Sequence, residues 1–165
     1  MIDRYLTSVF RFSYSLLNDK QKAEDIAQET FLVLWEKAEK WEPTGHLRSW
    51  LFRIARNKSI DEIRRTKEFL DIETVGMVDL KKSPYNELFD HQLTNIMHMH
   101  MQSLPVRQRE AITLVHFLEC SNIEAAETMD ISVDALESLL ARGRRQLKKL
   151  LDKHKDLLFK EVSRG

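Results

Sequence analysis

The chain has 165 residues, of which 42% are apolar, so it is long enough for one ordinary domain or for two small ones with a linker. Its 26 basic residues balance 26 acidic ones, so total charge favours no class of partner, and a single cysteine, Cys120, excludes an internal disulfide and is typical of a reducing cytoplasm. No signal peptide is recognisable, and no apolar run approaches the roughly 20 residues that a membrane span needs. We therefore expect a cytoplasmic protein without membrane insertion.

The charge is unevenly distributed along the chain. Residues 1–67 carry 13 basic and 10 acidic side chains, residues 68–102 carry two and six, and residues 103–165 carry 11 and 10. An acidic middle between two mildly basic flanks indicates two functional pieces with a dissimilar connector.

The apolar residues of the first part recur at helical spacing and predict helices at about residues 3–17, 21–40 and 46–67. The second of these helices places several apolar side chains, Trp35 among them, on one broad face. After the third helix, residues 68–88 lose the period and gain acidic side chains. We predict a linker there.

The predicted helix at 46–67 is strongly basic, with seven basic and two acidic residues. Asn57 suits base-edge reading and Trp50 offers a stacking platform, so single-stranded or distorted DNA is a candidate ligand. Trp50 also shares a helix face with Leu47 and Leu51, which favours a position in the core. The basic residues at the helix end equally complement the helix dipole, so this signal alone does not decide.

Helical patterns resume in the last part of the chain, at about residues 87–102, 106–119, 122–129 and 133–157. The last two, a short helix and a longer basic one joined by a tight turn, form a helix-turn-helix pattern. No strand pattern and no internal repeat is visible, so the predicted fold class is all-α.

The predicted helix from Val133 is amphipathic, with leucines and Gly143 on one side and basic residues on the other. A solvated helix face is the simplest explanation. However, no acidic residue lies between Ala141 and Leu151, so the i,i+4 ion pairs typical of such a face are missing, and DNA contact is favoured. The candidates for base contacts are Ser132, Asp134, Ala135, Glu137 and Ser138, and those for backbone contacts are Arg142, Arg144, Arg145, Lys148 and Lys149.

Other chemistry finds little support. His98 and His100 invite a metal site, but residues two apart on a helix point in nearly opposite directions, so we expect no metal. Cys120 has no basic neighbour in sequence that would activate its thiol. The sequence contains no phosphate-binding glycine loop and no HExxH or GxSxG motif, so we expect neither a cofactor nor an enzyme.

Four segments together resemble one known family. They are AEDIAQETFLVLWEKA at 23–38, LRSWLFRIARNKSIDEIRR at 47–65, LPVRQREAITLVHF at 104–117 and IEAAETMDISVDALESLLARGRRQLKKLL at 123–151. In this order and spacing they resemble the extracytoplasmic-function (ECF) sigma factors, the two-domain group of bacterial transcription initiation factors. The resemblance covers almost the whole chain except the linker.

The resemblance implies a division into a region 2 domain at 1–67, a linker at 68–88 and a region 4 domain at 89–165. The partners that it implies are core RNA polymerase, promoter DNA and an anti-sigma factor. The polymerase-binding residues would be Asp25, Gln28, Glu29 and Phe31, although Phe31 also suits the core. Those for the minus-ten promoter element would be Trp50, Arg53, Arg56, Asn57, Lys58, Arg64 and Arg65, while the helix-turn-helix would read the minus-thirty-five element.

Two alternatives remain open at this stage. A stand-alone helix-turn-helix regulator would use residues 104–151 for DNA and the first part of the chain to dimerise or sense. A sigma mimic would sequester a protein partner without reading DNA. The motif at 23–38 favours a sigma factor over the regulator, and the basic helix at 46–67 favours it over the mimic.

Overall fold

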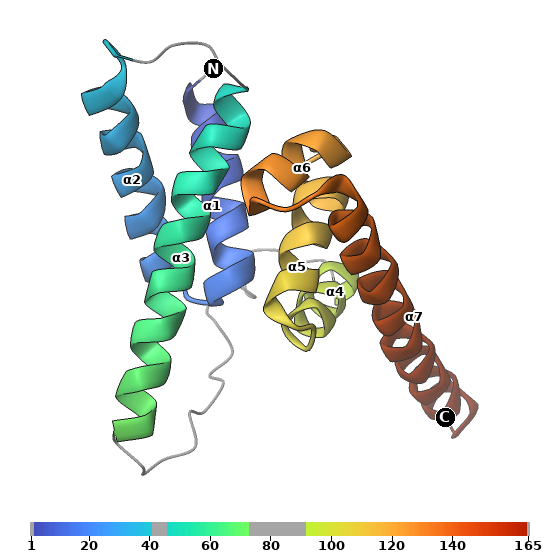
Figure 1. The fold of residues 1–165 in the computed structure, drawn as a ribbon. Coiled ribbons are helices and arrows are strands. Elements are labelled where there is room, and N and C mark those ends of the chain that lie inside the picture. Colours follow the sequence, from blue (N-terminus) through green and yellow to red (C-terminus); the bar gives the residue numbers. More distant parts are fainter. Residues whose placement is uncertain (1, 41–45, 73–91, 165) are drawn as a thin grey trace.

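The structure is a computed structural model that describes residues 2–40, 46–72 and 92–164. The first three helices, α1 (Ile2–Leu17), α2 (Lys20–Lys37) and α3 (Leu47–Ile72), all contact one another and form an N-terminal helical unit (Figure 1). Phe12 of α1 and Phe52 of α3 meet edge to face in its core, with their ring centroids 5.5 Å apart. This is the arrangement that a pair of aromatic quadrupoles prefers, and it fixes α3 against α1.

The connection between α1 and α2 is set by two residues. Asn18 adopts a left-handed conformation with φ of 50°, which asparagine tolerates better than most residues and which ends α1. Asp19 then caps α2, because its carboxylate accepts a hydrogen bond from the backbone N–H of Lys22 at 3.1 Å. The two helices therefore reverse direction within a short turn.

The C-terminal helical unit contains α4 (Gln92–Gln102), α5 (Val106–Ile112), α6 (Asn122–Met129) and α7 (Val133–Arg164). A π-helical segment, η2 (Thr113–Phe117), continues α5. In the part of the chain that the structure describes, every regular element is a helix, which confirms the predicted all-α class. None of these described helices is long and apolar enough to cross a membrane.

Local capping explains the helix-turn-helix. Ser121 and Glu124 form a reciprocal capping box at the start of α6, and Asp130 ends that helix in the left-handed conformation. Ser132 then accepts a hydrogen bond from the backbone N–H of Ala135 at 3.1 Å and opens α7. The short helix, the turn and the longer helix that the sequence predicts are confirmed.

Gly143 allows α7 to approach α5 closely. A Cβ atom at this position would lie 2.5 Å from Cδ1 of Ile112, which is a buried side chain of α5. The glycine on the apolar side of α7 is therefore a packing residue, which accepts the usual cost of glycine within a helix.

The two units pack directly against each other, which the sequence did not predict. Helix α3 contacts α6, and α1 contacts α4 and α5, so one buried apolar cluster runs through both units (Figure 1). Helix α3 also continues to Ile72, past the predicted start of the linker at 68, and α7 continues past 157. The remainder of the predicted linker, 73–88, lies outside the described residues.

Candidate nucleic-acid interfaces

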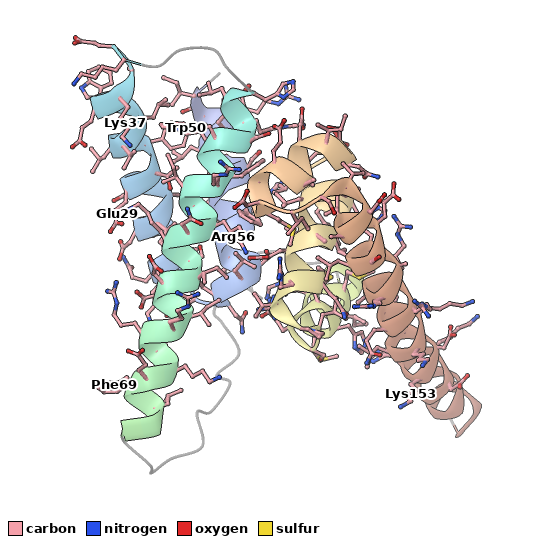
Figure 2. The ribbon with its side chains drawn as sticks, in the orientation of Figure 1. Glu29, Lys37, Trp50, Arg56, Phe69 and Lys153 are labelled. Atoms are coloured by element: carbon pink, nitrogen blue, oxygen red, sulfur yellow. The ribbon has the colours of Figure 1, made fainter. Side chains whose placement is uncertain are left out.

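The basic side of α7 is open to solvent. All ten residues that the sequence assigns to the DNA-reading face of the helix-turn-helix are exposed, from Ser132 to Lys149. Among the described residues, no ion pair neutralises Arg142, Arg145, Lys148 or Lys149. Basic side chains extend outward from this helix, away from the rest of the molecule (Figure 2). The surface therefore has the free positive charge that phosphate binding requires.

Arg144 differs from the other basic residues of α7. Its Nε donates to Nε2 of His116 in η2, at 3.0 Å. Partial burial and the charge of Arg144 lower the pKa of His116, so the ring is held neutral and able to accept this bond. Arg144 is thus oriented by η2, at the edge of the exposed basic face.

The basic helix α3 faces the C-terminal unit with three arginines. Arg48 forms an ion pair with Glu124 of α6 and also donates to the backbone oxygen of Glu119 at 3.3 Å. Arg53 donates to the backbone oxygen of Glu127 at 2.7 Å, near the end of α6. Arg48 is a functional candidate that the sequence reasoning missed, although it stands two helical turns before Arg56 on the same face of α3.

The third arginine, Arg56, contacts a buried carboxylate. Its Nε lies 3.1 Å from Oε1 of Glu110, and the side chain of Glu110 is completely buried. Burial raises the pKa of Glu110, while the positive charge of Arg56 opposes that shift. The second carboxylate oxygen of Glu110 has no hydrogen-bond partner among the described residues, so Arg56 is the main compensation for this buried charge.

A fourth arginine, Arg109 of α5, joins the ends of two helices. It is 6% exposed and donates to the backbone oxygen of Leu16, at the end of α1, and to that of Gln102, at the end of α4. The two distances are 3.2 and 3.1 Å respectively. Helix C-termini carry partial negative charge, so one guanidinium stabilises a helix end from each unit.

The other predicted minus-ten residues have varied environments. Asn57, Arg64 and Arg65 are exposed, whereas Lys58 pairs with Glu29 of α2 at 3.1 Å. Trp50 is half-buried and packs against the apolar cluster, as its helical spacing from Leu47 and Leu51 predicted. Arg65 also pairs with Glu62 at 3.6 Å, so Asn57 and Arg64 are the members of this set that are exposed and form no ion pair among the described residues.

Helix α2 presents a different kind of surface. Asp25, Gln28 and Glu29 are exposed as a polymerase-binding set would be, but Phe31 packs on the core. Trp35, which the sequence places on the broad apolar face of this helix, is 83% exposed. Helical periodicity places Trp35 on the apolar face of α2, but it does not show whether another element covers that position. Together with the exposed Leu32, Trp35 gives this polar surface an apolar anchor.

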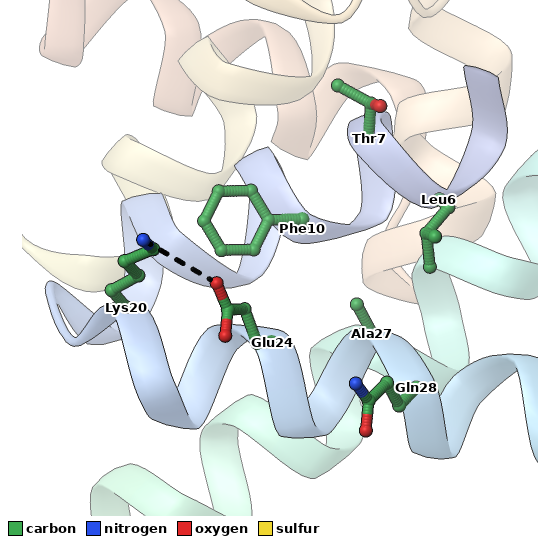
Figure 3. Close-up of a pocket in the computed structure, with 7 residues that line it drawn as sticks. All are labelled: Leu6, Thr7, Phe10, Lys20, Glu24, Ala27 and Gln28. Carbon is green, nitrogen blue, oxygen red and sulfur yellow. Dashed lines mark ion pairs between the residues drawn. The ribbon is translucent and has the colours of Figure 1, made fainter. Parts of the chain in front are cut away.

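A shallow hollow opens between α1 and α2 (Figure 3). Leu6, Thr7 and Phe10 line it from one side, and Ala27 and Gln28 from the other. At its end, Lys20 and Glu24 of α2 form an ion pair at 3.8 Å (Figure 3). No serine, cysteine or histidine is among the residues that line it.

The histidines considered as metal ligands face different neighbours. The ring of His98 stacks on Tyr14 of α1 with centroids 5.0 Å apart, and its Nε2 lies 2.9 Å from the side-chain oxygen of Asn18. His100 meets His154 of α7 edge to face.

Burial raises the pKa of the Cys120 thiol to about 11, so the thiol is protonated at neutral pH.

Two family models match the chain. Sigma-70 region 2 matches residues 1–69, and Sigma-70 region 4 matches residues 95–147. The chain is 32% identical over 153 residues to the ECF RNA polymerase sigma factor SigM of Bacillus subtilis (strain 168), which covers 90% of this chain and 91% of that protein. It is 30% identical over 162 residues to the ECF RNA polymerase sigma factor SigW of the same organism, and this match covers 92% of this chain and 87% of SigW.

Two solved structures are also similar. One is the sigma factor RpoE in complex with the anti-sigma factor NepR from Bartonella quintana, with a TM-score of 0.74, 29% identity and coverage of 90% of this chain and 92% of that one. The other is CnrH in complex with the cytosolic domain of CnrY, with a TM-score of 0.69, 25% identity and coverage of 92% and 85%.

Proposed function

The chain belongs to the ECF RNA polymerase sigma factors, and from that premise we propose how its two helical units divide the work of a promoter-specificity subunit. A sigma factor binds core RNA polymerase and directs transcription initiation, while the polymerase forms the bonds, so the chain is not itself an enzyme. In our proposal residues 1–67 bind the polymerase and the minus-ten element, 68–88 connect the units, and 89–165 read the minus-thirty-five element.

The exposed side of α7 carries the proposal for the minus-thirty-five element. Base edges would be read by the N-terminal part of the helix, where Ser132, Asp134 and Ser138 are exposed. The later basic residues, from Arg142 to Lys149, would contact phosphates. Because no acidic partner neutralises Arg142, Arg145, Lys148 or Lys149 among the described residues, these four are available to DNA without first breaking an internal ion pair.

Helices α2 and α3 would serve the polymerase and the minus-ten element. The exposed Asp25, Gln28 and Glu29, with Trp35 as an apolar anchor, suit a protein interface that has a polar rim and an aromatic centre. The exposed Asn57 and Arg64 of α3 suit single-stranded DNA. An intact α3 is needed for both surfaces, since Lys58 links it to α2 through Glu29.

We further propose an anti-sigma partner and a place in the cytoplasm. The similarity to RpoE in its complex with NepR extends over 90% of this chain in one superposition, so the arrangement of the two units resembles that of a sigma factor bound by its anti-sigma factor. A polymerase subunit works where the polymerase is, which supports the cytoplasm. A pull-down from the source cell with the whole chain, compared with a Leu32→Asp, Trp35→Asp variant, tests whether the partner uses the exposed end of α2.

Transcription itself provides the main test. The purified chain is mixed with bacterial core RNA polymerase and a genomic promoter library, and the transcripts are sequenced. Start sites that share upstream elements and vanish without the chain are the expected result. If no start sites arise while the chain alone retains specific duplexes, the stand-alone regulator replaces the sigma factor. Binding to neither polymerase nor DNA would leave the mimic.

A further inference from the structure

One arginine on the basic side of α7 is held by a different element of the chain. The Nε atom of Arg144 donates to Nε2 of His116 in η2, at 3.0 Å. By contrast, Nε of Arg145 donates to the backbone oxygen of Ala141, at 3.4 Å, within α7 itself. Among residues 142–149, whose side chains the structure describes, Arg144 is thus the basic residue with a hydrogen-bond partner outside its own helix.

The close packing of α5 on α7 brings the two side chains together. A Cβ atom at position 143 would lie 2.5 Å from Cδ1 of Ile112, so Gly143 leaves the space for this approach. His116 follows Ile112 by four residues, which is the spacing of neighbours on one face of a helix. The face that presents Ile112 to Gly143 therefore presents His116 to Arg144, the next residue of α7.

The backbone of η2 fixes the place of His116. The N–H of Leu118 donates to the backbone oxygen of Thr113 at 3.0 Å, across a turn that is one residue wider than in an α-helix. The N–H of Cys120 then donates to the backbone oxygen of Leu114 at 2.9 Å. Such π-helical turns are rare and occur frequently at functional sites. His116 is therefore carried by hydrogen-bonded backbone and not by a free loop.

The remaining nitrogens of Arg144 are available to a ligand. A guanidinium donates through Nε and through both terminal nitrogens, and the bond to His116 uses Nε. The two terminal nitrogens form neither an ion pair nor a hydrogen bond with the described part of the chain. Their N–H groups lie in one plane, which suits two parallel hydrogen bonds to a phosphate.

We propose that His116 is a positioning residue for DNA binding, which holds Arg144 so that its two terminal nitrogens bind one phosphate of the promoter duplex. An unrestrained arginine gives up rotamer freedom when it binds, and this loss weakens the affinity. Because the bond to His116 orders the guanidinium before DNA arrives, part of that loss has already occurred in the free chain. The proposal rests on the DNA-binding role proposed for α7, whereas the bond itself does not.

Nitrogen NMR of the histidine rings tests the bond without DNA. Because Nε2 of His116 accepts a hydrogen bond, the proton of the neutral ring must lie on Nδ1. Correlation spectra of the isotope-labelled whole chain at neutral pH should show this tautomer, with the ring assigned by its absence from His116→Gln. The preference should be lost in Arg144→Ala, which has no donor. A proton on Nε2 in the unmodified chain overturns the proposal.

A double-mutant cycle tests the effect on DNA binding. The unmodified chain, His116→Ala, Arg144→Ala and the double variant are each titrated, without polymerase, into a fluorescein-labelled duplex of random sequence and followed by anisotropy. His116→Ala should weaken binding about two- to tenfold, which corresponds to the ordering of one long side chain. The same change should have no effect in the Arg144→Ala background, because His116 acts through Arg144. An equal loss in both backgrounds overturns the proposal.

His116→Gln is the conservative variant that should restore binding. Its amide oxygen can accept the hydrogen bond at the place of Nε2, so part of the affinity lost in His116→Ala should return. Both His116 and Arg144 are exposed, so we expect every variant to fold, and circular dichroism checks this. Equal weakness of a folded His116→Gln and His116→Ala would overturn the role of the ring as acceptor.

The salt dependence of Arg144→Ala separates this inference from the function on which it rests. Loss of one phosphate contact should reduce the slope of log K against log salt by about 0.9. Lys37→Ala, on the N-terminal unit, removes the same charge from an exposed position and is the matched control. If Arg144→Ala lowers the slope but His116→Ala binds normally, DNA binding by α7 stands and the positioning role is overturned. If no variant of the basic residues of α7 differs from Lys37→Ala, the DNA-binding role itself is overturned.

Discussion

Replacement of Arg142, Arg145 and Lys149 by alanine should change how salt affects duplex binding by the whole chain. All three side chains are exposed, and no described ion pair involves them, so each is free to displace one condensed counterion from DNA. Each phosphate contact contributes about 0.9 to the slope of log K against log salt, so three contacts contribute about 2.7. Between 50 and 200 mM salt the unmodified chain should therefore lose about 40-fold more affinity than the variant.

Fluorescence anisotropy with a labelled duplex over that salt range measures both slopes. The matched control replaces Arg11, Lys37 and Lys40, which are exposed on the N-terminal unit, and changes the net charge by the same amount. It should weaken binding slightly and leave the slope within about one counterion of the unmodified chain. An equal slope in the α7 variant and the unmodified chain would refute phosphate contact by this face. An equal fall in both variants would show that net charge alone governs binding.

Three further predictions concern stability, each measured by urea unfolding. Gly143→Leu should lower the free energy of unfolding by about 1–3 kcal/mol, although leucine is the better helix former, because Ile112 already fills the space; the exposed Ala141→Leu should be nearly neutral. Arg109→Lys should cost about 1–3 kcal/mol, because an ammonium cannot bond both helix ends as the guanidinium does, and no loss would show that one bond suffices. Burial and the charge of Arg109 lower the pKa of His98 in the folded chain. The neutral ring therefore contributes to the free energy of unfolding above the ordinary histidine pKa near 6.5, and this contribution is lost as pH falls through the lowered pKa. Stability should therefore decline as pH falls below about 6.5, and less steeply in His98→Phe; identical pH profiles would contradict this.

Local patterns predicted much of the fold and part of the candidate site. Apolar periodicity located the helices. Ser132, a residue type that caps helix N-termini, located the start of α7 and with it the turn of the helix-turn-helix. The absence of acidic residues between Ala141 and Leu151 correctly indicated an exposed, unpaired basic face. These features depend on residues within one or two helical turns of each other, which is the range that a sequence pattern reports.

The packing of the two units depends on contacts that no local pattern reports. Arg48 and Glu124 are 76 residues apart, and Arg56 and Glu110 are 54 apart. Periodicity shows that an arginine lies on a helix, but not whether its partner is a phosphate or a distant carboxylate. The same limit applies to Trp35, because an apolar face is buried only where another element reaches it.

One residue did carry a signal for the packing. Glu110 stands immediately before the apolar Ala111 and Ile112, which are buried in the same helix, and a charge in such a place needs a partner. The basic face of α3 has the nearest surplus of positive charge in the N-terminal unit, with seven basic residues against two acidic ones over 46–67. A buried acid in one unit and unpaired arginines in the other therefore predict an interface between them.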